Sequence, residues 1–202
     1  MLAACHQQVL QMLDSLERLG NHLDQIGADA WARQAACDLM RFFDLAAVHH
    51  HNDEELHVVP RLRRLGSNVL AQKVLDEHRA LARDWDQIRR GLSNLSIHAD
   101  ELREGLSVRR AAWRRFAADY RAHIGLEERE VFPAIRAAID TASLREIGEE
   151  MSRRRAADHR FGAPPDRVAA YAPPNCRDDA RGIPSLEPVG PVAPFRLPAA
   201  RR

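Results

Sequence analysis

The spacing of hydrophobic positions predicts helices along most of residues 1–154. Apolar side chains recur every three or four residues, as they do on one face of an α-helix. Breaks near Gly27 and Gly66 and a polar connection over residues 93–105 separate these stretches. The pattern predicts helices over residues 2–23, 29–65, 68–92 and 107–138, with a short fifth helix over residues 141–154. No segment alternates polar and apolar residues as a strand would.

Four long amphipathic segments joined by short connections are typical of an all-α, antiparallel up-down four-helix bundle. We therefore predict this fold, with the short fifth helix, for a domain over residues 1–154. Proline content changes sharply afterwards, because two prolines occur in residues 1–154 and nine in residues 155–202. A segment this rich in Pro, Arg and Ala can neither propagate a helix nor build a core. We predict a mostly disordered C-terminal tail over residues 155–202.

A repeated motif in the second and fourth predicted helices is the clearest chemical signal in the chain. Residues 50–60 align without gaps on residues 123–133, and both copies read His-x-x-x-Glu-Glu-x-x-Val-x-Pro. The two prolines of the predicted domain, Pro60 and Pro133, occupy the same position in both copies. The domain therefore contains an internal repeat that carries a histidine and two carboxylates in each copy.

A further histidine precedes each copy of the motif. His6 lies 44 positions before His50, and His78 lies 45 positions before His123. Each of these histidines, and the first Glu of each motif, lies on the apolar stripe of its helix. Since residues at i and i+4 lie one above the other on a helix, each His–Glu pair aims at one point. The helix lengths between breaks place all of them at similar heights. We predict that six side chains meet in the core: His6, His50, Glu54, His78, His123 and Glu127.

Two carboxylates in an apolar core need a partner, because burial of an unpaired charge is costly. No Lys or Arg lies on the helix stripes near this level. Two iron ions bridged by Glu54 and Glu127, with imidazoles as terminal ligands, would satisfy these groups. Nitrogen and oxygen ligands without thiolate suit Fe, Mn or Zn. We predict a non-haem di-iron centre, with Mn or Zn as alternatives, and leave a seventh ligand open between His51, Glu55 and His57.

The stretches "CHQQ", "HHHNDEELHVVP", "DEHRAL" and "HIGLEEREVFP" resemble bacterial hemerythrin-like (HHE cation-binding) domains over roughly residues 1–154. The resemblance implies a hemerythrin-like bundle with the same six ligands. It also implies a di-iron site that binds O2 or a related diatomic, or that senses iron or redox state. Hemerythrin oxygen carriers have a second histidine one turn from the first on the third helix, where this chain has Val74 and Ala82. They also have an Asp five positions after the last histidine, where this chain has Glu128.

Three kinds of function fit these features. We expect a binding module for O2, NO or peroxide, or a sensor of iron or redox state, rather than an enzyme. The second is a ferritin-like di-iron oxidase, which needs Glu-x-x-His on two helices, whereas this chain has one such match, from Glu54 to His57. The third is a structural-metal interaction bundle with the tail as a partner-binding arm. Composition alone gives no support for a protein partner of the tail.

Charge and cysteine content bear on the classes of partner and on the cellular location. The 30 Lys and Arg nearly balance the 29 Asp and Glu, so we expect no nucleic acid or anionic membrane as a partner. No apolar run reaches the length of a membrane span. Three cysteines without paired spacing do not suggest a disulfide framework, which favours a cytoplasmic location.

Overall fold

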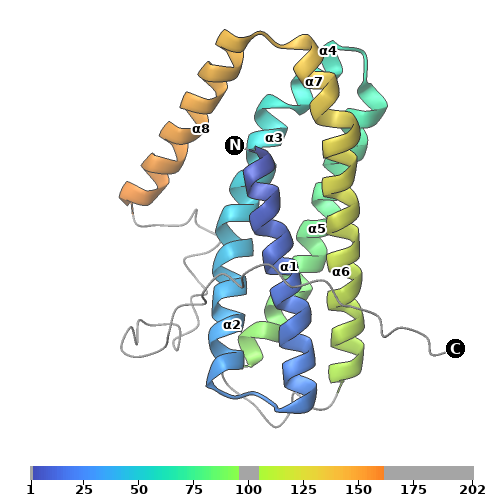
Figure 1. The fold of residues 1–202 in the computed structure, drawn as a ribbon, viewed down its shortest axis with the longest axis vertical. Coiled ribbons are helices and arrows are strands. Elements are labelled where there is room, and N and C mark those ends of the chain that lie inside the picture. The colour runs from blue at the N-terminus through green and yellow to red at the C-terminus, as the bar shows by residue number, and fades with distance from the viewer. Residues whose placement is uncertain (1, 96–104, 162–202) are drawn as a thin grey trace, which may run out of the picture.

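The computed structural model describes residues 2–95 and 105–161, and within these ranges the regular structure is helical (Figure 1). The α-helices are α1 (Leu2–Gln25), α2 (Ala30–Arg41), α3 (Ala47–His57), α4 (Val59–Arg64), α5 (Asn68–Asn94), α6 (Leu106–Leu126), α7 (Phe132–Ala138) and α8 (Thr141–Phe161). Two π-helical turns, η1 (Phe42–Ala46) and η2 (Glu127–Val131), interrupt them. No strand occurs in the described ranges, which confirms the predicted all-α class.

The long helices pack in a ring. Helix α1 contacts α2 and α6, and α5 contacts the same two helices from the other side. In Figure 1 the chain runs down α1, back up through α2 and α3, down α5 and up α6. The expected helix over residues 29–65 is a nearly continuous path through α2, η1, α3 and α4. The helical bundle therefore places α1, α3, α5 and α6 around one common interior.

Local sequence signals set the ends of the helices. Asp29 is the N-cap of α2, and its side chain accepts a hydrogen bond of 2.8 Å from the backbone N–H of Ala32. Gly27 and Gly66 adopt φ angles of 107° and 79°, where a residue with a side chain would be strained. These two glycines therefore allow the chain to reverse between α1 and α2 and between α4 and α5.

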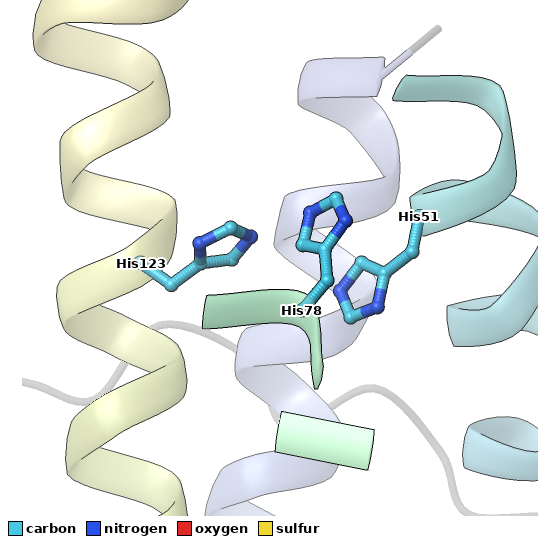
Figure 2. A group of neighbouring side chains, drawn as sticks. All are labelled: His51, His78 and His123. Carbon is cyan, nitrogen blue, oxygen red and sulfur yellow. The ribbon is translucent and has the colours of Figure 1, made fainter. Parts of the chain in front are cut away.

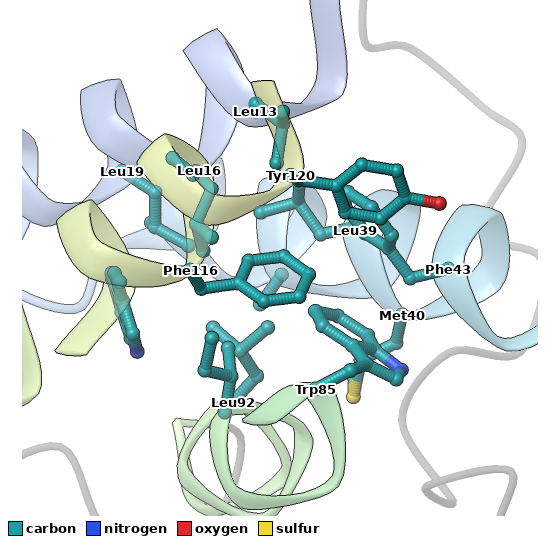
Figure 3. Close-up of a cluster of buried hydrophobic side chains, with 14 of the residues drawn as sticks. Leu13, Leu16, Leu19, Leu39, Met40, Phe43, Trp85, Leu92, Phe116 and Tyr120 are labelled. Atoms are coloured by element: carbon teal, nitrogen blue, oxygen red, sulfur yellow. The ribbon is translucent and has the colours of Figure 1, made fainter. Parts of the chain in front are cut away.

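The apolar core consists of two clusters. The larger one joins α1, α2, α5 and α6 and includes Leu16, Phe43, Trp85 and Phe116 (Figure 3). The smaller one joins α4, α5 and α7 and includes Leu62. Along α1, α3, α5 and α6, the sequence passes from one cluster to the other through a short polar layer. This layer carries the predicted metal ligands, and the two apolar clusters enclose it.

The π-helical turns differ from the continuous α-helices that the sequence predicts over residues 29–65 and 107–138. In η2 the backbone N–H of Phe132 bonds to the carbonyl of Glu127, five residues earlier, and η1 shows the same pattern. A π-helical turn contains an extra residue and shifts the side chains that follow it, and such turns are frequent at functional sites. Pro60 and Pro133 lie in the first turns of α4 and α7, where the missing N–H breaks no helical bond.

Helix α8 begins as predicted at residue 141 but continues past Arg154 to Phe161. Its ion pairs hold it to α3: Arg154 contacts the buried Asp53 at 2.8 Å, and His57 contacts Glu150 at 2.7 Å. Met151 is buried beside them. The rest of the predicted tail, residues 162–202, and most of the predicted polar connection lie outside the described residues.

Two observations bear on the setting of the protein. None of the helices in the described ranges has the length and apolar character needed to cross a membrane. Cys37 is disulfide-bonded, whereas the cysteine spacing predicted no disulfide framework. A cytoplasmic location therefore stays a prediction.

The larger apolar cluster should carry much of the stability of the bundle. Leu16 is fully buried in it, and we expect Leu16→Ala to lower the free energy of unfolding by about 2–5 kcal/mol, because the substitution leaves a cavity. Leu56 is 56% exposed, so Leu56→Ala is the matched control and should change stability by less than about 0.5 kcal/mol. Urea denaturation of both variants measures the difference, and equal effects would contradict the assignment of the core.

Candidate metal centre

The structure brings the six residues predicted from the sequence together at one level of the bundle. They come from four helices and the start of a π-helical turn: His6 from α1, His50 and Glu54 from α3, His78 from α5, His123 from α6 and Glu127 from η2. Each of these side chains is between 0% and 3% exposed. Six polar groups therefore meet in the interior between the two apolar clusters.

The six residues form two overlapping groups. Within each group, ligand atoms from all four residues lie within 4.8 Å of one another. The first group is His6, His50, Glu54 and Glu127, and the second is His78, His123, Glu54 and Glu127. Both groups contain both carboxylates, while the histidines divide between them in pairs. This arrangement suits two metal ions that share two bridging carboxylates.

The two oxygens of Glu127 face different groups. Its Oε2 lies 3.1 Å from Nε2 of His6, in the first group. Its Oε1 lies 3.4 Å from Nε2 of His123 and 3.8 Å from Nε2 of His78, in the second group. One carboxylate thus contacts histidines from three helices and both groups, as a bridging ligand would.

Glu54 divides its oxygens in the same way. Its Oε1 lies 3.4 Å from Nε2 of His50, in the first group, and its Oε2 lies 3.4 Å from Nε2 of His78, in the second. Glu54 and Glu127 occupy equivalent positions in the two copies of the motif. The internal repeat therefore supplies the two shared carboxylates as a related pair.

Several atoms of this layer lack hydrogen-bond partners in the described structure, although they are buried. They are both ring nitrogens of His50, both oxygens of Glu54, Nε2 of His78, Nε2 of His123 and Oε1 of Glu127. A buried polar atom without a partner costs free energy, so such atoms are rare and need an explanation. Here nearly all of them are atoms able to bind a metal ion, and they face a common centre. The donor set therefore fits metal ions.

The outer nitrogens of three histidines bind a second set of carboxylates. The Nδ1–H groups donate in three pairs: His6 to Glu128 at 3.0 Å, His78 to Glu55 at 3.0 Å and His123 to Glu77 at 2.8 Å. A carboxylate on Nδ1 fixes the tautomer and leaves the Nε2 lone pair for a metal ion. Sequence reasoning missed this role, although the second Glu of each motif copy is a visible signal for two of the three pairs.

Two of these three outer pairs cross between the two halves of the repeat. Glu55 follows Glu54 and holds His78 of the second hairpin. Glu128 follows Glu127 and holds His6 of the first hairpin. Each half therefore orients a histidine of the other half, which explains why both motif copies contain two consecutive Glu residues.

The three candidates for a seventh ligand occupy different places. Glu55 binds the outer nitrogen of His78, and His57 binds Glu150 of α8. His51 alone among them belongs to a further group, in which its ligand atom and those of His78 and His123 lie within 4.8 Å of one another (Figure 2). Of the three candidates, His51 is therefore the one that could share a metal group with two of the central histidines.

Burial and close charges shift the acidity of the central groups in opposite directions. Burial, together with the charge of Glu127, raises the pKa of Glu54 to about 8. Burial opposes a charge on His78, but the nearby carboxylates of Glu127 and Glu54 outweigh this and raise its pKa to about 10. Burial lowers the pKa of His50 to about 3. Because metal ligands bind in their deprotonated form, metal ions would displace protons from these groups.

Comparison with known proteins gives two findings. The sequence model of the Hemerythrin HHE cation binding domain matches residues 1–135, a range that contains all six central residues. An uncharacterised protein of Haemophilus influenzae is 29% identical over 157 residues, which cover 77% of this chain and 88% of that protein. The range matched by the family model ends before α8, which begins at Thr141.

The outer carboxylates should strengthen metal binding without contacting the metal. We expect Glu128→Ala to lower metal affinity about 10–100-fold, because His6 loses the partner that orients its ring. Glu130, exposed in the same π-helical turn, gives the matched control, and Glu130→Ala should leave affinity unchanged. Competition with a chromophoric chelator measures both variants. Equal affinities for the two would show that Glu128 does not support the site.

Proposed function

The chain belongs to the Hemerythrin HHE cation-binding family, and we propose that it holds a non-haem di-iron centre that binds or senses O2, NO or peroxide. The proposed ligands are the six central residues: His6, His50, Glu54, His78, His123 and Glu127. The observation that carries the proposal is the pair of carboxylates shared by two histidine groups. A single ion would not need both oxygens of both carboxylates to face different histidines.

The chemistry of the donors supports iron. The two groups offer imidazole nitrogens and carboxylate oxygens without thiolate, a set that suits Fe and also Mn or Zn. Two histidines and one oxygen from each bridge give four protein atoms per ion, which leaves coordination positions open for a small ligand. Bound iron would supply the redox chemistry and the reversible ligand binding. The protein's own groups would hold the ions, orient the imidazoles and exclude water.

The surroundings favour a small, weakly polar ligand. All six ligand side chains are at most 3% exposed, and apolar clusters lie on both sides of them. Phe132 stacks on His6 with 5.3 Å between ring centroids, which closes one side of the first group. A diatomic molecule or peroxide is small enough to enter such a layer, whereas a larger substrate would require the helices to separate. This supports binding or sensing more than turnover of an organic substrate.

The other proposals concern the setting of the site. The packing of α1, α2, α5 and α6 supports the antiparallel up-down four-helix bundle. We retain a domain over residues 1–154 with a separate tail, and a cytoplasmic location, as proposals.

A ferritin-like oxidase is a weaker candidate, because His57 of the single Glu-x-x-His match contacts Glu150 rather than the central groups. A structural-metal bundle predicts ions that do not respond to O2.

Metal analysis with absorption spectroscopy tests the function. Protein reconstituted with ferrous iron without oxygen should contain about two irons per chain, as the two groups indicate. On exposure to O2 it should develop ligand-to-iron charge-transfer bands, because the open positions then take up the ligand. NO and peroxide are tested in the same way. A fully loaded protein whose spectrum does not change with O2, NO or peroxide would establish a structural role for the metal instead.

The shared carboxylates predict a pattern of metal loss among variants. Glu127→Ala should release both ions, because Glu127 contacts histidines of both groups. His50→Ala should release about one ion per chain, because His50 belongs to the first group alone. Iron content by elemental analysis distinguishes these results, with His49→Ala, which lies outside all three groups, as the control. Loss of one ion from both variants would contradict the bridging role.

A further inference from the structure

His51 lies beside the second metal group without being one of its four members. Its ring approaches His78 and His123 closely enough for all three to offer ligand atoms within 4.8 Å (Figure 2). The equivalent position in the second motif copy is Ile124, which packs in the larger apolar cluster. The repeat is therefore asymmetric here, and among the described residues an additional histidine joins the group of His78 and His123 but not the other group.

Two contacts hold the His51 ring in its place. It stacks on His78 with 4.1 Å between centroids and 9° between planes. Its Nε2 lies 2.8 Å from the hydroxyl oxygen of Tyr120, a residue that is 1% exposed. A tyrosine hydroxyl carries its proton at neutral pH, so it can donate a hydrogen bond to Nε2. With the ring proton of His51 on Nδ1, this hydrogen bond occupies the lone pair of Nε2.

The stacking also prevents His51 from binding the ion held by His78. An imidazole lone pair lies in the plane of its ring, and a ligated ion sits about 2 Å from the nitrogen in that plane. Nearly parallel rings 4.1 Å apart aim their lone pairs along separate planes, so they cannot meet at one ion. His51 would have to leave Tyr120 and turn about its side-chain bonds before it could become a ligand.

We propose that His51 is a displaceable ligand that Tyr120 holds in reserve beside the ion of His78 and His123. While Nε2 accepts the Tyr120 hydrogen bond, that ion keeps a coordination position open for a small exogenous ligand. When the hydrogen bond is released, His51 turns and closes the position. One lone pair serves one partner at a time, so the two states exclude each other. The inference rests on the proposed metal centre but not on the identity of the metal.

The position of His51 can be read directly in zinc-loaded protein. Zinc is diamagnetic, so nitrogen-15 NMR of the histidine rings shows whether Nε2 of His51 accepts a hydrogen bond or binds the ion. We expect the hydrogen-bonded form in the natural protein and the zinc-bound form in Tyr120→Phe, which keeps the ring of Tyr120 and removes its hydroxyl. Zinc-bound Nε2 in the natural protein would overturn the proposal, as would identical spectra for both proteins.

Azide binding to cobalt-loaded protein tests the consequence. Loss of one hydrogen bond should favour the closed state, so azide affinity should fall about 3–10-fold in Tyr120→Phe. The double variant Tyr120→Phe/His51→Ala should recover the natural affinity, because no reserve ligand remains. His51→Ala alone should retain both cobalt ions, and its azide affinity should equal or exceed that of the natural protein, because no reserve ligand can close the position. His49→Ala is the control for loss of a neighbouring histidine.

The outcomes separate this inference from the proposed function. Loss of an ion from His51→Ala would make His51 a permanent ligand and overturn the inference alone. Unchanged azide affinity in Tyr120→Phe would also overturn the inference alone, since the hydrogen bond would then not control the open coordination position. A natural protein that takes up neither zinc nor cobalt would overturn the metal centre itself. Uptake of two ions with the expected azide pattern but no response of the iron form to O2 would leave this inference supported and the diatomic role refuted.

Discussion

The burial of two carboxylates side by side constrains the whole of this structure. Glu54 and Glu127 are both 0% exposed, and an uncompensated charge in such a place costs several kcal/mol. The surrounding helices reduce this cost by placing imidazoles next to both carboxylates. The second Glu of each motif copy lies at the rim of the layer, where its carboxylate is 43% or 46% exposed and remains hydrated. Charge is thus compensated at the centre and tolerated at the edge.

The same layer joins the two halves of the repeat. Glu54 and Glu127 each contact histidines of both hairpins, and Glu55 and Glu128 each hold a histidine of the opposite hairpin. Polar contacts therefore connect the halves at one level, while apolar packing connects them above and below. Because ligands from both halves contribute to each group, metal binding and correct docking of the hairpins should be thermodynamically linked.

Local irregularities coincide with the site rather than with the ends of the bundle. The turn η2 begins at Glu127 itself, and η1 ends four residues before His50. A π-helical turn is less favourable than an α-helical one, so it persists where packing and function compensate. The repeat is also imperfect at His51 and Ile124, where one half keeps a histidine and the other an apolar residue. This difference makes the two metal groups chemically unequal.

The sequence by itself determined the all-helical class, the bounds of the long helices to within a few residues, and the six residues that converge. These depend on hydrophobic periodicity and on a gapless repeat, both of which are local properties of the chain. The sequence did not predict the π-helical turns, because the balance between α- and π-helical turns depends on what packs against the helix. It also placed the end of α8 at residue 154, whereas the helix continues to Phe161.

Only the tertiary structure decided what the neighbours of the ligands do. Glu55, His51 and His57 lie within seven positions of one another, and the sequence could not rank them as ligands. The fold directs Glu55 to His78, His51 to Tyr120 and His57 to Glu150 of α8. Each partner is at least 23 positions away in sequence, so the contact is set by how the helices pack and rotate against each other, which no local pattern encodes.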